Sequence, residues 1–408
     1  MTTAIHHPAS EHQDGKPMPP LHGIRVIELA NVISGPYAAM VLLDLGADVI
    51  KVELPGTGDP FRRWDARSRE SSDAFKSINR GKRSVAVDIR TEAGQRAVVR
   101  LIESADVLIE NFRPGFLDAL GLGYGDLMQH NLRLVYCSIR GMNDSDQRPV
   151  YDAIAQARSG LWSQFTDMTR PTPSGPALAD HLAGMQGALA VLAALVQRSR
   201  TDRGAHVTAT MLGACVSIQE IAFANYFSSG EVADRMSRVR ASQSHGFVCA
   251  DGLPIAIHLS SVSKFWTSLV SALGVPELAD DERFASPAAR REHYEELHDV
   301  LSRVFVTEPR QVWLERLTAA DVPVAPILTV AEATEDELVT SLDLFHRFGS
   351  GERAFTGVGS PIAGFAAPDR SAAVPWVGEH TEAVLAEVGI DRQAVASGGA
   401  GAAVGGQE

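Results

Sequence analysis

The sequence predicts an α/β protein with a large Rossmann-like domain on a mostly parallel sheet and a smaller α+β domain. From residue 21 to about 145, short apolar runs alternate with helical segments, which is typical of right-handed βαβ units. The apolar runs are continuous rather than alternating, as expected for strands that are covered on both faces. A predicted hairpin near residue 250, followed by three helices, indicates the smaller domain.

The elements of the large domain follow one another in a regular order. The run IRVIEL (24–29) predicts the first strand, and PYAAMVLLDLGA (36–47) predicts the first helix. Further strands are expected at 48–53, 84–89, 106–112 and 134–141, with a helix at 93–105. The apolar stretch LAGMQGALAVLAALVQ (182–197) predicts a buried helix, and 208–227 predicts another after a turn at 201–205.

The smaller domain begins with the stretch GFVCADGLPIAIHL (246–259). It predicts a hairpin, because Asp251-Gly252 is a strong turn signal. The segment 321–333 holds two prolines and is expected to be an extended connector, and helical spacing returns at 378–390. Three helices are expected between the hairpin and the connector, at 264–274, 291–305 and 310–320.

The junction between the first strand and the first helix reads LANVISGPYAA (29–39) and lacks the glycine pattern GxGxxG. Chemistry that depends on NAD or FAD is therefore not favoured, despite the predicted sheet topology. The sequence also lacks HExxH, a P-loop, GxSxG and paired CxxC motifs, and its thirteen histidines show no ligand spacing. No metal site is expected.

The net charge of −13 over 408 residues argues against nucleic acid or an anionic membrane as the main partner. No apolar run reaches the roughly 18–20 residues that span a bilayer. The three cysteines are scattered, which indicates a reduced, cytoplasmic location. Residues 51–113 differ from the whole chain in the sign of their charge, because they contain thirteen Lys or Arg against ten Asp or Glu. This local excess is either a solvated basic face or a site for a phosphate-bearing small molecule.

Asp180 stands at the start of the apolar helix, and two roles are open to it. Aspartate is a good helix N-cap, because its side chain accepts hydrogen bonds from unpaired backbone N–H groups. A carboxylate at the edge of a buried helix is also well placed to act as a nucleophile. The residues around it leave both roles open.

Seven stretches of the chain carry a resemblance to a known family. In order, they read GIRVIELANVISGPYAAMVLLDLGADVIKVELPGTGDPFRRW, NRGKRSVAVDIRTEAG, ADVLIENFRPG, YDAIAQARSG, RSRTDRGAHVTATML, DVPVAPILTVAEA and GEHTEAVLAEVG. Together they resemble the class III CoA transferases, the CaiB/BaiF family of formyl-CoA transferases and carnitine CoA-transferases. The resemblance extends from about residue 21 to 390.

The resemblance implies that Asp180, in LADHLAG (178–184), is the catalytic nucleophile of a CoA-transferase. In the family, this carboxylate forms a mixed anhydride with the donor acyl group and then a thioester with CoA. The CoA then passes to a small carboxylic acid. CoA and acyl-CoA are therefore expected as substrates, with no prosthetic group, and the identities of the donor and the acceptor stay open.

The resemblance also implies a set of CoA contacts. They fall on Ile33, Ser34, Val87 to Arg90, Asn111, Phe112, Arg113, Tyr151 and Asp152. This chain departs from the pattern at three positions where formyl-CoA transferases carry basic residues, which here are Leu54, Ala119 and Pro149. Four arginines could take over the phosphate contacts or could be surface charges, namely Arg62, Arg63, Arg83 and Arg113.

Two other functions compete with CoA transfer. The α-methylacyl-CoA racemases resemble this chain in its first blocks, but their basic histidine falls where this chain has Tyr151. A phenol is a poor base at neutral pH, so Tyr151 favours the transferase. A CoA-binding protein without turnover is the third possibility, and the presence of Asp180 argues against it.

The resemblance further implies an interlocked homodimer whose linkers thread through the partner. The expected segments are a disordered N-terminus (1–20), the first part of the large CoA-binding domain (21–200), a linker helix (201–225), the small domain (226–325), a second linker (326–350), the C-terminal part of the large domain (351–392) and a disordered tail (393–408).

Overall fold

The computed structural model describes residues 18–65, 71–173, 175–259, 262–366, 369, 371 and 373–391. The chain forms two compact units, each built from separate stretches of sequence. The first comprises Met1–Gly160, Gly175–Gln219 and Asp343–Glu408, and the second comprises Leu161–Ser174 and Glu220–Leu342. The disordered termini expected at 1–20 and 393–408 lie outside the described residues, apart from residues 18–20.

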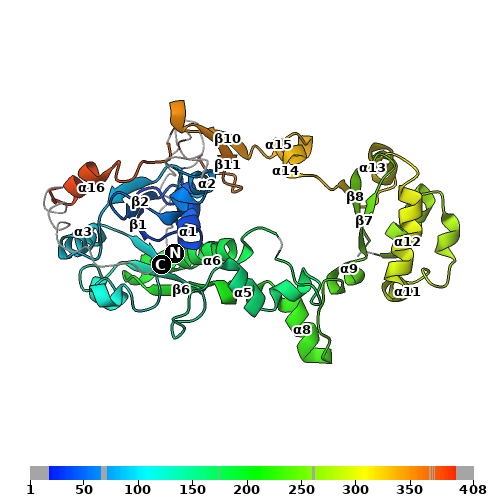
Figure 1. The fold of residues 1–408 in the computed structure, drawn as a ribbon, viewed down its shortest axis with the longest axis horizontal. Coiled ribbons are helices and arrows are strands. Elements are labelled where there is room, and N and C mark those ends of the chain that lie inside the picture. Colours follow the sequence, from blue (N-terminus) through cyan, green and yellow to red (C-terminus); the bar gives the residue numbers. More distant parts are fainter. Residues whose placement is uncertain are drawn as a thin grey trace, which may run out of the picture. The chain divides into compact units, whose positions relative to one another are not determined.

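A six-stranded parallel sheet forms the centre of the first unit, which confirms the predicted α/β class (Figure 1). The strand order is β3-β2-β1-β4-β5-β6. The strands are β1 (Arg25–Leu29), β2 (Asp48–Glu53), β3 (Arg83–Ala86), β4 (Val107–Glu110), β5 (Val135–Arg140) and β6 (His206–Thr210). Such a parallel sheet requires crossover connections, and helices provide them.

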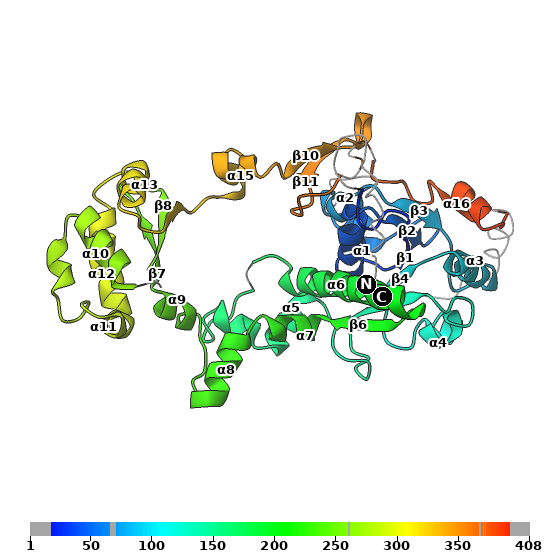
Figure 2. The ribbon, with the colours of Figure 1, turned by 180° about the vertical axis from the view of Figure 1, so that it is seen from behind.

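Helices cover both faces of this sheet. On one face, α1 (Ser34–Asp44) and α6 (Leu178–Thr201) lie side by side (Figures 1 and 2). On the other face, α3 (Glu92–Glu103) and α16 (Thr381–Glu387) share one apolar core with the strands. The first unit also contains α2 (Asp73–Asn79), α4 (Tyr124–Leu127), α5 (Asp152–Arg158), α7 (Met211–Ser217), β10 (Phe345–Phe348) and β11 (Phe355–Val358).

The alternation of side chains along β1 divides its residues between the two faces. Ile27 and Leu29 are buried in the core with α3 and α16, where each contributes about 1.5–3 kcal/mol of transfer free energy. Glu28 lies between them and points to the opposite face. There it pairs with Lys82, whose ammonium also donates to the carbonyl of Pro36. A buried carboxylate therefore lies beneath the first turn of α1.

The prediction of a helix at 208–227 is wrong for the first residues of that range. His206–Thr210 forms β6, which pairs in parallel with β5. The β-branched Val207 and Thr208 favour a strand, and the apolar residues that indicated a helix follow in α7 and in α8 (Glu220–Ser229). The apolar helix predicted at 182–197 is confirmed, although α6 begins four residues earlier.

The second unit has a three-stranded antiparallel sheet of β7 (Ser244–Val248), β8 (Pro254–His258) and β9 (Val324–Pro326). The predicted hairpin is confirmed, with Gly252 at φ +77° in its turn. Part of the expected connector at 321–333 is extended, as predicted, but it pairs with β8 as β9. The helices of this unit include α8, α9 (Ser237–Ser242), α10 (Val262–Ala272), α11 (Pro287–Glu292), α12 (Tyr294–Phe305), α13 (Arg310–Ala319), α14 (Val330–Ala333) and α15 (Glu337–Ser341).

One helix departs from the expectation that no stretch is long and apolar enough to span a bilayer: among the described residues, α6 meets both conditions by length and composition. The buried share of its apolar window is 39%. The core helix of a soluble protein has the same character, and α6 packs on both α1 and the sheet.

Candidate active site

The site lies where the direction of the sheet reverses. β1 and β4 are neighbours at the centre of the sheet, and the chain leaves them toward opposite edges. The loops that follow these two strands are tied together by one side chain. Asn111 accepts a hydrogen bond from the Asn31 backbone N–H (2.9 Å) and donates to the Asn31 carbonyl (2.8 Å) and the Ser34 hydroxyl (3.3 Å). The two strand ends therefore form one edge of a cavity.

A close contact between two helices brings Asp180 to this edge. A Cβ atom at Gly184 would lie 2.7 Å from the Ser34 carbonyl oxygen and 3.0 Å from the Tyr37 ring, so only glycine allows α6 this near to α1. Asp180 lies one turn before Gly184 on the same face of α6. Asp180 consequently lies beside the N-terminal turn of α1, and it lines a cavity of about 220 Å³ with Ile33 and Ser34.

The interpretation of Asp180 as the N-cap of its helix is wrong, because another carboxylate accepts hydrogen bonds from the N-terminus of that helix. α6 begins at Leu178, which places Asp180 in its first turn rather than at its cap. Asp152, the first residue of α5, accepts hydrogen bonds from the backbone N–H groups of Ala179 (2.7 Å) and Asp180 (3.2 Å). The carboxylate of Asp180 is therefore not occupied in capping its own helix.

The surroundings of Asp180 change its acidity. Burial raises the pKa of this carboxyl to about 7, and the negative charge of Asp152 acts in the same direction. A large share of the molecules then carries an ionised Asp180 at neutral pH. Such a carboxylate is poorly solvated, which makes it a better nucleophile than an exposed aspartate.

The structure gathers most of the predicted CoA contacts around two cavities. The cavity of Asp180 is also lined by Ile33, Ser34, Asn111, Phe112, Arg113 and Tyr151. A second cavity, of about 440 Å³, is lined by Val87, Arg90 and Phe112, together with Leu54 and Phe116. Asn31 and Phe112 border both cavities, which makes them neighbours. Asp152 lines neither cavity.

Several basic residues of 51–113 are buried in ion pairs and do not belong to a solvated face. Arg62 is 2% exposed and forms two hydrogen bonds with Glu53, at 2.7 and 2.8 Å. Arg80 is paired with Asp44 in the same two-point manner. The interpretation as a solvated face is therefore wrong for these residues.

The arginines proposed to replace the missing phosphate contacts differ in availability. Arg62 is buried, and Arg83 is paired with Asp48 and Glu387 and lines neither cavity. The structure does not favour these two. Arg63 lines the larger cavity and Arg113 lines the cavity of Asp180. Neither forms an ion pair with another described residue, so both are available to an anion.

Other arginines at the cavities already have partners. Arg90 binds Asp88 through two hydrogen bonds of 2.8 Å. Arg140 is paired with Glu110 at 2.6 Å, and Arg148 is paired with Asp146. These pairs reduce the positive charge that the cavities present.

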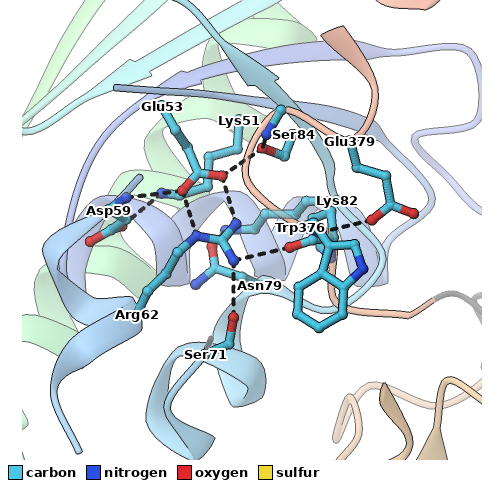
Figure 3. A network of polar contacts seen from close by, with 12 residues as sticks. Lys51, Glu53, Asp59, Arg62, Ser71, Asn79, Lys82, Ser84, Trp376 and Glu379 are labelled. Carbon is cyan, nitrogen blue, oxygen red and sulfur yellow. Dashed lines mark hydrogen bonds and ion pairs between the residues drawn. The ribbon is translucent and has the colours of Figure 1, made fainter. Parts of the chain in front are cut away.

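A buried network of charges lies under the site (Figure 3). Lys51 contacts Glu28 at 2.6 Å and Asp59 at 2.9 Å, and it donates to the Ala30 carbonyl at 2.8 Å. Burial opposes the charge of Lys51, but the carboxylates of Asp59, Glu28 and Glu53 raise its pKa, so it stays an ammonium group. The sequence-based reasoning missed this network. Its signal was the presence of charges inside otherwise apolar strands.

No group of three or more His, Cys, Asp or Glu side chains suited to a metal ion occurs among the described residues. The three cysteines are buried, and burial raises the pKa of Cys137 to about 12 and that of Cys215 to about 11. Thiols of this kind are poor nucleophiles. Unlike these thiols, the carboxylate of Asp180 lines a cavity.

Comparisons with known proteins show which chains this one is similar to. The profile of CoA-transferase family III matches residues 21–381. A succinate–glutarate CoA-transferase of Agrobacterium fabrum is 35% identical over 388 residues, covering 91% of this chain and 96% of the relative. An acetyl-CoA:oxalate CoA-transferase of Acetobacter aceti is 31% identical over 384 residues, covering 93% and 98%. The crystal structure of a CaiB/BaiF family protein from Brucella suis has a TM-score of 0.81 at 33% identity, covering 90% of this chain and 99% of that one.

Proposed function

This chain belongs to CoA-transferase family III and is a CoA-transferase, and from this premise we propose that covalent intermediates on Asp180 carry its reaction. The enzyme moves CoA from an acyl-CoA thioester to a carboxylic acid. One observation carries the proposal. Asp180 is a half-buried carboxylate with a raised pKa, free of any capping role, at a cavity beside the N-terminus of α1.

The first half of the reaction releases the donor acid. An Asp180 carboxylate oxygen attacks the thioester carbonyl carbon, and the C–S bond breaks to leave a mixed anhydride and CoA thiolate. The thiolate then attacks the aspartyl carbonyl carbon of the anhydride. The donor acid leaves as its carboxylate, and Asp180 is left as a thioester of CoA. Splitting the transfer in this way replaces one difficult step by easier ones.

The second half runs the same steps in reverse with the acceptor acid. The acceptor carboxylate attacks the aspartyl thioester, which forms a second mixed anhydride and releases CoA thiolate. The thiolate attacks the carbonyl derived from the acceptor. The new acyl-CoA forms, and the Asp180 carboxylate is regenerated. No proton is gained or lost over the cycle.

The N-terminus of α1 supports the charge that develops in these steps. Each attack places negative charge on a carbonyl oxygen near Asp180. No side chain among the described residues caps α1, whose N-cap position is Ile33 and whose first residue is Ser34. The unpaired N–H groups of that turn and the helix dipole stabilise an oxyanion there.

The two neighbouring cavities fit the two ends of CoA. The larger cavity has apolar walls that include Val52, Val87 and Phe116, which suit an adenine ring, and its Arg63 is available to a phosphate group. The smaller cavity continues past Arg113 to Asp180, which suits the diphosphate and the thiol arm. Leu54 lies at the larger cavity in place of a basic residue, so we propose Arg63 and Arg113 as the phosphate contacts of this chain.

The homodimer expected from the resemblance is part of the same proposal. Large apolar side chains of α6 are exposed, namely Met185, Leu189 and Val196. Burial of such residues against a second copy would remove apolar surface from water. Light scattering after size-exclusion chromatography measures the mass directly. The cytoplasmic location stays a prediction.

A panel of donors and acids tests the activity. The purified protein is incubated with succinyl-CoA, acetyl-CoA or formyl-CoA and with glutarate, oxalate or succinate, and the new CoA thioesters are identified by mass spectrometry. We expect exchange with at least one pair and none with Asp180→Ala. Retention of exchange in Asp180→Ala would contradict the proposed chemistry.

A further inference from the structure

The loop between β1 and α1 contains a strained backbone conformation. Val32 has φ +66°, in the left-handed region. Five non-glycine residues among those described have positive φ, and the other four are Asp202, Gln243, Asp321 and Asp343. A β-branched residue is an outlier in this region, and such strain persists only where the surrounding structure holds it.

A buried carboxylate holds Val32 in this conformation. Asp59 has no exposed surface, and its two oxygens lie 3.1 and 3.2 Å from the Val32 backbone nitrogen. Asp59 is held in turn by Lys51, whose ammonium is 2.9 Å away, and by the Phe61 N–H at 2.9 Å. Figure 3 shows Asp59 and Lys51 pointing toward each other within the buried network.

The same network fixes both ends of the loop. Lys51 binds the carbonyl of Ala30 just before the loop, and Lys82 binds the carbonyl of Pro36 just after it, each at 2.8 Å. The residues between these anchors include Val32, Ile33 and Ser34, which line the cavity of Asp180. The network thus fixes the part of the chain that presents the N-terminus of α1 to the nucleophile.

We propose that Asp59 is a positioning residue for CoA transfer, which holds Val32 in the left-handed conformation so that the first N–H groups of α1 face Asp180. This inference rests on the proposed function. Asp59 acts through the backbone of Val32 and does not touch the substrate. Buried ion pairs are often no more stabilising than apolar residues of the same size, so stability alone does not account for this one.

Asp59→Asn tests the inference, with Asp44→Asn as the matched control. Asp44 is a buried aspartate in an ion pair with Arg80, at the opposite end of α1 from the loop. Both variants lose a buried charge and are expected to unfold at lower temperature than the wild type. The first measurement is the rate at which the Asp180–CoA adduct forms at saturating succinyl-CoA, determined by rapid quench and mass spectrometry. The second is the affinity for CoA, determined by calorimetry.

The two variants are expected to differ in rate. Asp59→Asn slows adduct formation by about tenfold or more, because a displacement of about 1 Å in a catalytic group has effects of that size. Its affinity for CoA is largely kept. Asp44→Asn keeps the wild-type rate. Equal rates in the wild type and Asp59→Asn, or an equal loss in both variants, would overturn the inference.

Substitution of Val32 tests the same relationship from its other side. Glycine adopts positive φ without strain, so Val32→Gly is expected to restore much of the rate when it is added to Asp59→Asn. Val32→Pro fixes φ near −65° and removes the N–H while leaving the Asp59–Lys51 pair in place. Val32→Pro is expected to form the adduct more slowly than the wild type and to keep the fold. If Asp59→Asn does not fold, this variant still tests the positioning role.

The outcomes separate this inference from the proposed function. A wild-type protein that exchanges CoA, together with an unimpaired Val32→Pro or no rescue by Val32→Gly, overturns the positioning role alone. A wild-type protein that forms no adduct with succinyl-CoA and exchanges no CoA in the wider panel overturns both.

Discussion

Asp152 caps the helix that carries Asp180, so two carboxylates share one helix end. Asp152 accepts hydrogen bonds from the Ala179 and Asp180 N–H groups at 2.7 and 3.2 Å. Asp152 thereby binds the positive N-terminal end of α6, and the carboxylate oxygens of Asp180 stay available at the cavity. Burial raises the pKa of Asp180, and the charge of Asp152 raises it further.

The rate of the first half-reaction should depend on pH through Asp180. Below its pKa of about 7 the carboxyl is protonated and cannot attack, so the rate should fall as the pH is lowered below 7 and reach a plateau above it. Stopped-flow measurement of CoA adduct formation between pH 5 and 9 gives the profile. A flat rate down to pH 5 would show that Asp180 ionises at the ordinary value for an aspartate.

Asp152→Asn should shift this profile to lower pH. The substitution removes the neighbouring negative charge while an amide oxygen can still accept from the Ala179 N–H. Gln156, which donates to the other oxygen of Asp152, can reverse its own amide to match. The apparent pKa should drop below that of the wild type but stay above the ordinary value of about 4, because burial remains. An unchanged pH profile would show that the charge of Asp152 does not raise the pKa of Asp180.

Asp180→Asn should make the protein more stable at high pH. An unfolded chain ionises Asp180 near pH 4, whereas the folded chain keeps the proton until about pH 7, so the wild type loses stability between these values. The neutral amide avoids this loss. The variant should gain about 1–3 kcal/mol at pH 8 and little at pH 4, as measured by urea unfolding. The same difference at both pH values would contradict the shifted pKa.

The sequence predicted the central architecture because its strands are continuous apolar runs separated by helices. It did not predict β6, since His206–Thr210 is short, lies at the edge of the sheet and directly precedes an apolar helix. Edge strands carry a weaker hydrophobic signal, because only part of their surface is buried. The neighbouring apolar residues then favoured one long helix.

The candidate site was only partly predictable for a different reason. Glu28 and Lys51 stand inside apolar strands, which is a visible anomaly, but only the register of β1 against β2 makes them direct partners. The capping of α6 by Asp152 joins residues that are 27 and 28 positions apart. Caps are usually local, so the sequence near Asp180 gave no sign of it.

Arg113→Ala should weaken CoA binding, because Arg113 is exposed at the cavity of Asp180 and forms no ion pair with another described residue. A roughly tenfold loss of affinity, about 1.4 kcal/mol, is expected for one charge-assisted contact with a phosphate. The loss should shrink at high salt. Calorimetry on Arg83→Ala and Arg316→Ala provides the controls, since neither residue lines the two cavities. Equal affinity in all three variants would place the phosphate contacts elsewhere.

The enzyme should not exchange the α-proton of 2-methylacyl-CoA. Tyr151 is 67% exposed at the cavity, where a racemase would need a base, and a phenol is a poor base at neutral pH. Incubation in deuterated water without an acceptor acid, followed by mass spectrometry of the thioester, measures the exchange. Rapid incorporation of deuterium would support the racemase instead.

Covalent capture of Asp180 tests the central claim most directly. The protein is incubated with an acyl-CoA that it uses in exchange, treated with hydroxylamine, digested and mapped by mass spectrometry. The account predicts an adduct with the added mass of CoA less one water before treatment and a hydroxamate at Asp180 alone after it, with neither in Asp180→Ala. Modification at another residue, or full transferase activity in Asp180→Ala, would contradict it.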